Sequence, residues 1–143
     1  MEVHFLEKND DYEAVLKALL SLRTSYDLDT LSNQIQKQYE YGYKVAYVRS
    51  SDGILAVAGF CVGEKLAWGK HIYIDDLITN PNYRSTGVGR FFINWFKEFA
   101  AKNNCEQIHL DSGVQRFPAH KFYLREGFNI ASHHFSIADV KGG

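Results

Sequence analysis

The sequence predicts a mixed α/β domain whose central sheet is mostly antiparallel and contains one parallel crossover. Two segments with strand periodicity, 44–49 and 54–62, flank a turn sequence at 50–53, which predicts an antiparallel hairpin. Further along, an amphipathic helix over 88–102 separates two strand-like segments, which predicts a parallel strand–helix–strand unit.

The first part of the chain predicts one strand and two helices before the hairpin. Residues 3–6 alternate between apolar and polar side chains, as a short strand does. The run 10–13, two aspartates followed by a tyrosine and a glutamate, has the signature of a capping box. Apolar residues at helical spacing follow it, so a helix is expected over about 11–23, and a second, more polar helix over 29–41.

The rest of the chain predicts two further strand–helix pairs and a last strand. A long strand over 70–79 ends just before Pro81, and the helix over 88–102 has a wide apolar face. The remaining predicted elements are a strand over 107–111, a helix over 118–126 and a final strand over 128–137. No linker, repeat or charge block interrupts this order, which predicts one domain over residues 1–143.

Composition excludes several classes of function. The chain has 143 residues, of which 16 are basic and 17 acidic, so it lacks the positive field that holds nucleic acid or an anionic membrane surface. Apolar runs are shorter than the ~18 residues that span a bilayer, and the N-terminus does not resemble a signal peptide. Two cysteines without metal-ligand spacing, Cys61 and Cys105, fit reduced thiols in a cytoplasmic protein. His133 and His134 are adjacent in a predicted strand and face apart, so we expect no metal site.

A glycine-containing loop between the strand over 70–79 and the helix over 88–102 predicts an anion site. Gly87 and Gly89 let backbone N–H groups turn inward, and the start of the helix adds unpaired donors and the positive end of its dipole. Such a loop suits phosphate or pyrophosphate, although a tight turn that merely needs glycine is the alternative. Phe92 stands where a dinucleotide fingerprint needs a small residue, and the P-loop sequence is absent.

Two motifs give the chain a family resemblance. The pattern Arg84-x-x-Gly87-x-Gly89 at the start of a helix resembles the pyrophosphate motif of the GNAT superfamily of N-acetyltransferases, and Phe122-Tyr123-x-x-x-Gly127-Phe128 resembles its second conserved segment. The element order extends the resemblance over essentially the whole chain, toward bacterial members of unassigned substrate. The resemblance implies helices on both faces of the sheet, a V-shaped split between the fourth and fifth strands, and acetyl-CoA as co-substrate.

The resemblance also implies where acetyl-CoA is held. The pantetheine arm and acetyl carbonyl would pair with the backbone of Leu77, Ile78 and Thr79. The pyrophosphate would lie beside the Arg84 side chain and against the amides of the loop: Ser85, Thr86, Gly87, Val88, Gly89 and Arg90. Donors aimed at the carbonyl of a thioester would stabilise the oxyanion of acyl transfer.

Tyr123 matches the general acid of the family, which protonates the departing CoA thiolate. A phenol with a pKa near 10 can return a proton to a thiolate of similar basicity. From the residue alone, a core tyrosine on an amphipathic helix is the alternative. His120, one helical turn earlier, is expected to touch CoA or to orient the phenol. An asparagine that often precedes this helix in the family is absent, and Gln115 or Arg116 would have to replace it.

Asp75 and Asp76 are consecutive acids in an otherwise apolar strand, which is costly unless a cleft or a partner receives them. Asp75 matches a position where several amine-acetylating members carry a glutamate, so we expect it to act as the base, through a water, or to anchor the ammonium; Asp76 is the second candidate. Alternation places Asp75 on one face with His71 and Tyr73, and Asp76 on the other unless a bulge intervenes. A strand-end acid paired with a nearby Arg or Lys is the alternative.

The acceptor is expected to be the primary amine of a small molecule or a protein. Specificity in the superfamily comes from the first two helices and the last strands, and the helical region here offers aromatic and acidic residues that suit a cation: Tyr26, Asp27, Asp29, Tyr39, Glu40, Tyr41 and Tyr43. We expect Tyr26, Tyr39, His71 and Tyr73 to contact the acceptor; His71 as a proton relay or as a structural residue stays open.

Two further expectations concern assembly and class. Many relatives pair through their last strands, and residues 135–137 offer an apolar edge, so a homodimer is expected. The alternative to an enzyme is a CoA-binding or regulatory module that kept the fold and lost turnover.

Overall fold

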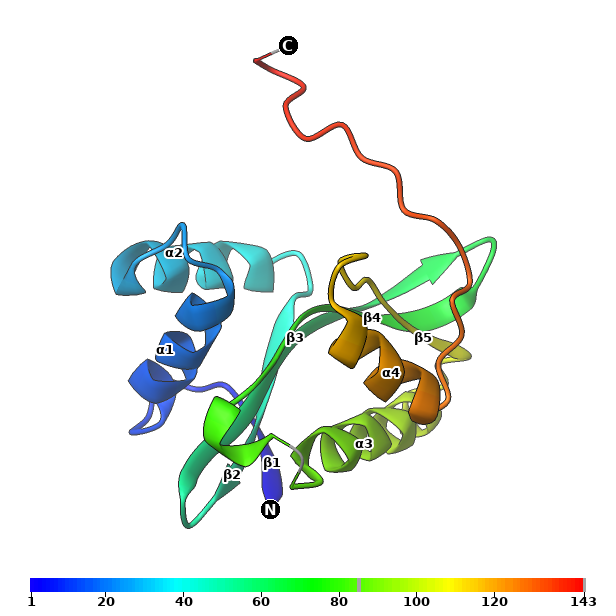
Figure 1. Ribbon diagram of the computed structural model, residues 1–143. Coiled ribbons are helices and arrows are strands. Elements are labelled where there is room, and N and C mark those ends of the chain that lie inside the picture. The colour runs from blue at the N-terminus through cyan, green and yellow to red at the C-terminus, as the bar shows by residue number, and fades with distance from the viewer. Residues whose placement is uncertain (85, 143) are drawn as a thin grey trace. The chain divides into compact units, whose positions relative to one another are not determined.

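The chain divides into two compact units, Met1–Leu110 and Asp111–Gly143. The computed structural model, shown as a ribbon in Figure 1, describes residues 1–84 and 86–142. No helix in the described part of the chain is long and apolar enough to cross a membrane.

The first unit is built on a five-stranded sheet whose strands follow one another in sequence order. The strands are β1 (Glu2–Phe5), β2 (Lys44–Ser50), β3 (Gly53–Lys65), β4 (Gly69–Thr79) and β5 (Gln107–Leu110). The first three pairs are antiparallel, and β4 and β5 are parallel. This arrangement confirms the predicted fold class, including the hairpin and the single parallel crossover.

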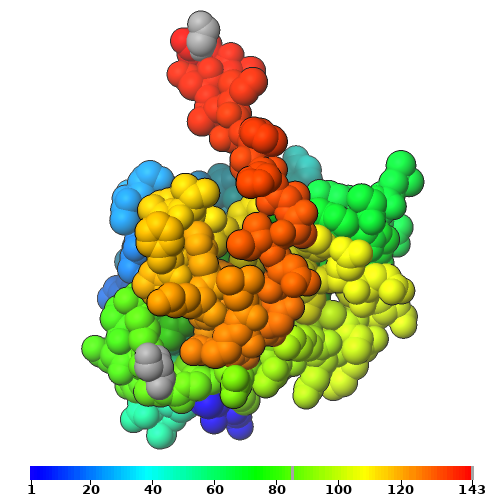
Figure 2. Space-filling model, turned by 45° about the vertical axis from the view of Figure 1, so that its right-hand side comes forward, coloured from blue at the N-terminus to red at the C-terminus, as the bar shows by residue number. Residues whose placement is uncertain are grey.

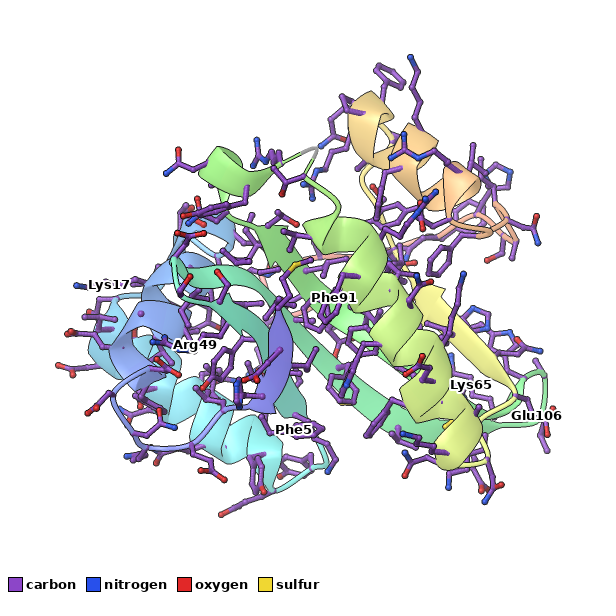
Figure 3. The ribbon with its side chains drawn as sticks, turned by 90° about the horizontal axis from the view of Figure 1, so that it is seen from below. Phe5, Lys17, Arg49, Lys65, Phe91 and Glu106 are labelled. Atoms are coloured by element: carbon purple, nitrogen blue, oxygen red, sulfur yellow. The ribbon has the colours of Figure 1, made fainter. Side chains whose placement is uncertain are left out.

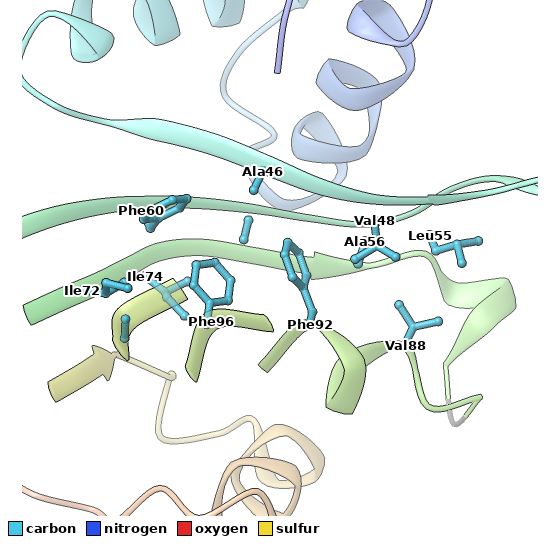
Figure 4. Packing of buried hydrophobic residues seen from close by; sticks show 12 residues of the cluster. Ala46, Val48, Leu55, Ala56, Phe60, Ile72, Ile74, Val88, Phe92 and Phe96 are labelled. Carbon is cyan, nitrogen blue, oxygen red and sulfur yellow. The ribbon is translucent and has the colours of Figure 1, made fainter. Parts of the chain in front are cut away.

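Helices cover both faces of this sheet. α1 (Tyr12–Leu22) and α2 (Leu28–Tyr39) pack on one face, and α3 (Val88–Lys102) packs on the other (Figure 1). The core under α3 is aromatic, and Figure 4 shows Phe92 and Phe96 of α3 directed at the strands that carry Phe60 and Ile74. The core under α1 and α2 joins helical leucines to Tyr43, just before β2, and to Tyr47 of β2. Apolar periodicity had predicted each of these helices to within two residues of its ends.

The predicted capping box at the start of α1 is wrong. Asp11 occupies the N-cap, but its side chain caps no amide of the helix. Its carboxylate instead accepts hydrogen bonds from Tyr47 Oη at 2.8 Å and Arg49 Nη1 at 2.6 Å, so it joins α1 to β2 (Arg49 is labelled in Figure 3). The capping box of this fold lies at α2, where Asp27 and Thr30 bond each other's backbone amides.

The second unit contains α4 (Phe117–Arg125), and the predicted strand over 128–137 is wrong. Within the described residues this segment forms no strand, and its apolar side chains Ile130, Phe135 and Ile137 are exposed. Figure 2 shows the end of the chain, orange to red, as a narrow extended segment. Alternating apolar residues predict a strand only where a neighbour accepts its backbone hydrogen bonds. The homodimer through residues 135–137 stays a prediction, because no strand edge forms there in the single chain.

Candidate active site

A short loop after β4 is held against the neighbouring strand by one asparagine. Asn80 donates its backbone N–H to Leu55 O at 2.8 Å and its side-chain amide to Ile54 O at 3.4 Å. Its side-chain oxygen accepts from the N–H of Asn82 at 3.0 Å, within a single 3₁₀ turn, Pro81–Tyr83. Asn80 therefore fixes the end of β4, from which the chain continues toward α3, to β3.

The start of α3 has the features of an anion cradle. Gly87 is the N-cap with φ +88°, and nothing lies within 4 Å of where a Cβ would be, so backbone conformation rather than crowding requires glycine here. Val88 and Gly89 begin the first turn of α3, where backbone N–H groups have no acceptor within the helix, and Arg90 follows them. The first turn carries no acidic side chain, which fits a phosphate group at the positive end of the dipole. Thr86 donates its hydroxyl to the Tyr83 carbonyl. Ser85, predicted to belong to this cradle, lies outside the described residues.

β4 and β5 are paired along only the first half of β4. The parallel ladder pairs four residues of each strand and ends at Ile74 and Leu110. The backbone of β4 beyond this point, including Leu77, Ile78 and Thr79, pairs with β3 on one side and has no β5 partner on the other. This is the split predicted between the fourth and fifth strands, and the backbone groups expected to pair with acetyl-CoA lie on the part of β4 that β5 does not pair.

A β-bulge at Asp75 places both aspartates on one face of the sheet. On β3, Gly59 pairs with Asp76 and the next residue, Phe60, pairs with Ile74, which leaves Asp75 as the extra residue. The alternation changes phase there, since Ile74 and Leu77, three residues apart, both pack in the core under α3. The two aspartates therefore share a face, which is the exception that the alternation of the strand allowed for a bulge.

Both aspartates line a pocket of about 270 Å³ between α1, α2 and β4. Its apolar walls come from helical residues, and its polar groups are two carboxylates, one guanidinium, two amides and two phenols. The lining consists of Leu19, Arg23, Tyr26, Leu31, Gln34, Ile35, Gln38, Tyr43, Asp75 and Asp76. The pocket carries one more negative than positive group, which suits a small cationic ligand.

The two carboxylates differ in their partners. Asp76 accepts from Arg23 Nε at 2.8 Å through one oxygen and from Tyr43 Oη at 2.6 Å through the other. Asp75 is more exposed, and the Cys61 thiol donates to its Oδ2 at 3.9 Å. Burial, and then the charge of Asp75, raises the pKa of Cys61. Asp76 is therefore held as an ion pair, and the Cys61 thiol lies beside the carboxylate of Asp75.

Burial, followed by the charge of Asp76, raises the pKa of the Tyr43 phenol far above its ordinary value of 10. The unfolded chain releases this proton near pH 10 while the folded chain retains it, so the contribution of Tyr43 to stability is present below pH 10 and is lost as pH rises above it. We expect the difference in unfolding free energy between wild type and Tyr43→Phe to fall by about 1.4 kcal/mol per pH unit above that point. Urea unfolding from about pH 8 to 11 measures this, and a difference that does not change with pH would contradict it.

Of the four residues predicted to contact the acceptor, one lines the pocket. Tyr26 lines the pocket, but Tyr39 is largely exposed outside the lining. His71 and Tyr73 lie instead in an aromatic cluster with Trp68 and His109, where Trp68 stacks on His109 at 3.4 Å between ring centroids. His71 is buried and its Nδ1 lies 3.0 Å from the Gly69 carbonyl oxygen, which fits the structural alternative.

Three pocket residues were not singled out by any sequence pattern: Arg23, Gln34 and Gln38. Arg23 ends α1 and meets Asp76, 53 positions away in the sequence. The amide of Gln34 donates to that of Gln38 at 2.9 Å, one helical turn later. Helical spacing could have placed the two glutamines on one side of α2, but nothing local indicates which side faces a pocket.

In the second unit, the Phe-Tyr…Gly-Phe motif forms the end of α4. Gly127, at φ +101°, donates its N–H to Leu124 O, and Phe128 donates its own to Tyr123 O at 3.0 Å, which is a Schellman motif. The Phe128 ring packs against the Tyr123 ring, with 5.7 Å between centroids. The glycine and phenylalanine of the motif therefore fix the helix turn that carries the tyrosine. Burial raises the pKa of Tyr123, and Arg116 opposes this rise.

The loop before α4 is closed by its own contacts. His120 Nε2 lies 2.7 Å from the Gly113 carbonyl oxygen, and Gln115 Oε1 would lie 2.8 Å from a Cβ on Gly113. Asp111 meets His134 Nδ1 at 3.2 Å. Among the residues that the structure describes, no group of three or more His, Cys, Asp or Glu side chains is placed to hold a metal ion.

Comparison with known sequences gives one family and several relatives. The model of the "Acetyltransferase (GNAT) family" matches residues 12–128. An "Uncharacterized N-acetyltransferase YhdJ" from Bacillus subtilis (strain 168) is 29% identical over 135 residues, which cover 91% of this chain and 93% of the relative. An "Aminoalkylphosphonate N-acetyltransferase" from Salmonella typhimurium is 32% identical over 65 residues, which cover 46% of this chain and 42% of that protein. A "Streptothricin acetyltransferase" from Streptomyces lavendulae is 31% identical over 78 residues, which cover 54% and 40%.

Solved structures share the fold over nearly the whole chain. An acetyltransferase from Trypanosoma brucei superimposes with a TM-score of 0.75 at 23% identity and covers 95% of this chain and 97% of its own. AAC(6')-Iy, in complex with the bisubstrate analogue CoA-S-monomethyl-acetylneamine, superimposes with a TM-score of 0.76 at 11% identity and covers 95% of each chain. At these identities the likeness concerns the fold alone.

Proposed function

This chain belongs to the GNAT family of acetyltransferases, and from that premise we propose that it transfers an acetyl group from acetyl-CoA to the primary amine of a small molecule. The observation that carries this proposal is the pocket at the β4 split, where the bulge directs Asp75 and Asp76 to the same side. An amine that enters this pocket meets carboxylates beside backbone groups that β5 leaves unpaired.

The residues of the first unit fit the acetyl-CoA that the family uses. The pyrophosphate would lie against the amides at the start of α3, with Arg84 and Arg90 supplying positive charge. The thioester would pair with the backbone of Leu77, Ile78 and Thr79, where donors stabilise the oxyanion that forms during transfer. Acetyl-CoA supplies the activated acyl group; the protein binds it and manages the protons.

Asp75 is proposed as the base for the amine. An acceptor ammonium must lose a proton before its nitrogen can attack the thioester carbon. Asp76 accepts hydrogen bonds from Arg23 and Tyr43 on its two oxygens, and Asp75 is the more exposed carboxylate of this pocket, so we assign Asp75 to receive this proton, directly or through one water. The amine nitrogen adds to the thioester carbon to form the oxyanion, and the adduct collapses to the amide as the C–S bond breaks and the second N–H proton leaves to water. Tyr123 returns a proton to the CoA thiolate, and its raised pKa keeps it protonated at neutral pH.

The state of the Cys61 thiol, which lies near the pocket, favours direct attack by the amine in a ternary complex over an acetyl-enzyme. An acetyl-enzyme would need an activated cysteine. Burial raises the pKa of Cys61, which keeps it in the thiol form, and the thiolate is the nucleophilic form. Initial-velocity lines that intersect when both substrates are varied would agree with a ternary complex, and parallel lines would indicate an acetyl-enzyme.

A small acceptor fits the size and charge of the pocket. The pocket volume of about 270 Å³ lies near the lower end of the range of ligand pockets, ~300–1,000 Å³. Two carboxylates against one guanidinium favour a cation, and Tyr26 offers an aromatic face for it. Two relatives are named for small-molecule acceptors, an aminoalkylphosphonate and streptothricin.

A screen of amines tests the proposed function. Purified protein is incubated with acetyl-CoA and a panel of small amines, diamines, amino acids and a lysine-containing peptide. Thiol release and product mass are measured together. We expect at least one small amine to gain the mass of one acetyl group with stoichiometric release of CoA. Calorimetric binding of acetyl-CoA without turnover across the panel would instead favour a CoA-binding module that has lost catalysis.

A further inference from the structure

We propose that Arg23, Tyr43 and Asp76 form a bulge lock, a set of positioning residues that aims the Asp75 carboxylate at the acceptor amine. This inference rests on the proposed function for its kinetic consequence, but the lock itself is a structural feature that can be tested without turnover. It assigns different roles to two aspartates that are adjacent in the sequence and share one pocket.

Arg23 holds the bulge from the side of α1. It is the C-cap of that helix, and its backbone N–H donates to Leu19 O at 2.9 Å, so its Cα is fixed by the helix end. Its side chain donates from Nε to Asp76 Oδ1 at 2.8 Å and from Nη2 to the Asp75 carbonyl at 3.0 Å. A bulged residue loses its place in the ladder, and a carbonyl left without a partner is costly. One guanidinium therefore satisfies the bulge carbonyl and the neighbouring carboxylate together.

Tyr43 holds the bulge through a hydrogen bond to Asp76, and its ring occupies the space left by the missing side chain of Gly59. Its phenol is buried and donates to Asp76 Oδ2 at 2.6 Å. Gly59 is the β3 partner of Asp76, and a Cβ built on it would lie 1.6 Å from Tyr43 Oη. Only glycine at position 59 lets the phenol reach the carboxylate. The lock thus depends on the C-cap of α1, the residue just before β2, and one residue each of β3 and β4.

The lock gives the two aspartates different freedom. Asp76 has a donor on each oxygen, so its side chain cannot turn toward a ligand without breaking a charge-assisted hydrogen bond. The backbone at residue 75 is held through its carbonyl, which fixes the direction in which the Asp75 side chain leaves the strand. The Asp75 carboxylate therefore contacts the amine from a fixed position. Asp76 does not contact the amine itself and acts by positioning Asp75.

The same core contains a second triad that serves as a matched control. Tyr47, four residues along β2, donates to Asp11 at 2.8 Å, and Arg49 pairs with the other oxygen at 2.6 Å. Side-chain exposures match closely, with arginines at 47% and 44% and aspartates at 15% and 19% in the lock and the control respectively. None of the control residues lines the pocket. Loss of either phenol removes the same kind of bond from the same core.

The kinetic test compares Tyr43→Phe with Tyr47→Phe, using the amine found in the screen. We expect Tyr43→Phe to lower kcat/KM for the amine by about tenfold or more, because a small displacement of the Asp75 carboxylate strongly lowers the rate of the reaction. We expect the KM for acetyl-CoA to stay within about twofold, and Tyr47→Phe to change both constants by less than about twofold. Equal losses in the two variants would show that each phenol is merely structural and would overturn the proposal.

A second readout uses Cys61, whose thiol lies beside Asp75 Oδ2, and needs no turnover. Alkylation by iodoacetamide near pH 8 is followed by mass spectrometry, with Cys105 as the internal reference. If the lock holds Asp75, its release in Tyr43→Phe should speed Cys61 alkylation about threefold, because the nearby carboxylate disfavours the thiolate. Tyr47→Phe should leave the rate unchanged, and equal rates in all three proteins would overturn the lock.

The two readouts separate the lock from the proposed function. An inactive wild type with a Cys61 response confined to Tyr43→Phe would support the lock and reject the transferase proposal. An active wild type, with Tyr43→Phe and Tyr47→Phe indistinguishable in both readouts, would support the transferase proposal and reject the lock. If Tyr43→Phe does not fold, Arg23→Gln replaces it, because its side chain is about half exposed and the same two outcomes apply.

Discussion

Replacing Asp75 with asparagine is expected to lower kcat/KM for the acceptor amine by about 10²–10⁴-fold, the range that a positioned general base contributes. The substitution keeps the shape of the side chain and removes the group that takes the proton of the ammonium. The loss should be largest near neutral pH, where an acceptor amine is almost fully protonated. Steady-state rates of thiol release, measured with the amine and acetyl-CoA varied separately, give the value.

Asp52→Asn is the control for this substitution, because Asp52 lies exposed in the turn between β2 and β3. We expect it to leave the kinetic constants within about twofold of wild type. Retention of wild-type kcat/KM by Asp75→Asn would remove Asp75 from the role of base and leave Asp76 as the candidate.

The second large effect is expected at Gly59, where alanine should destabilise the fold by about 3 kcal/mol. The new Cβ would lie 1.6 Å from Tyr43 Oη and 2.3 Å from its Cζ, so the ring or the strand must move. Tyr43 is buried and hydrogen-bonded to Asp76, which leaves the ring little room to give. Urea unfolding followed by circular dichroism measures the change as a shift in the transition midpoint at constant slope.

Gly63→Ala is the matched control on the same strand. A Cβ there would meet its nearest atom, His71 Cε1, at 3.5 Å, which is an ordinary contact. We expect a change below about 1 kcal/mol. Comparable losses at both glycines would mean that the cost comes from the strand backbone and not from the contact with Tyr43.

The elements that could be predicted are those whose signal is local. The apolar face of α3 and the turn between β2 and β3 lie within single segments, and the structure places both where the pattern indicates. The cradle at Gly87 is local as well, since a positive φ and a helix start are adjacent in the chain. The Phe-Tyr…Gly-Phe motif likewise forms its own helix end through the bond from Phe128 to Tyr123.

The features that could not be predicted depend on partners far away in the sequence. The bulge at Asp75 exists because β3 pairs with β4 in two registers, and nothing within residues 70–79 reveals it. Asp11 had the pattern of a helix cap, but residues of β2 engage its carboxylate instead. Residues 128–137 alternate like a strand, but they form none among the described residues, where no neighbouring strand pairs with them.

The central claim, that the acceptor amine is acetylated over Asp75 in the pocket between α1, α2 and β4, is tested most directly by a crystal structure with CoA and the acceptor bound. We expect the amine nitrogen within about 3 Å of the Asp75 carboxylate, or one bridging water away, with Asp76 still paired to Arg23 and Tyr43. An acceptor nitrogen bound outside this pocket, with Asp75 in contact with neither the amine nor a shared water, would contradict it.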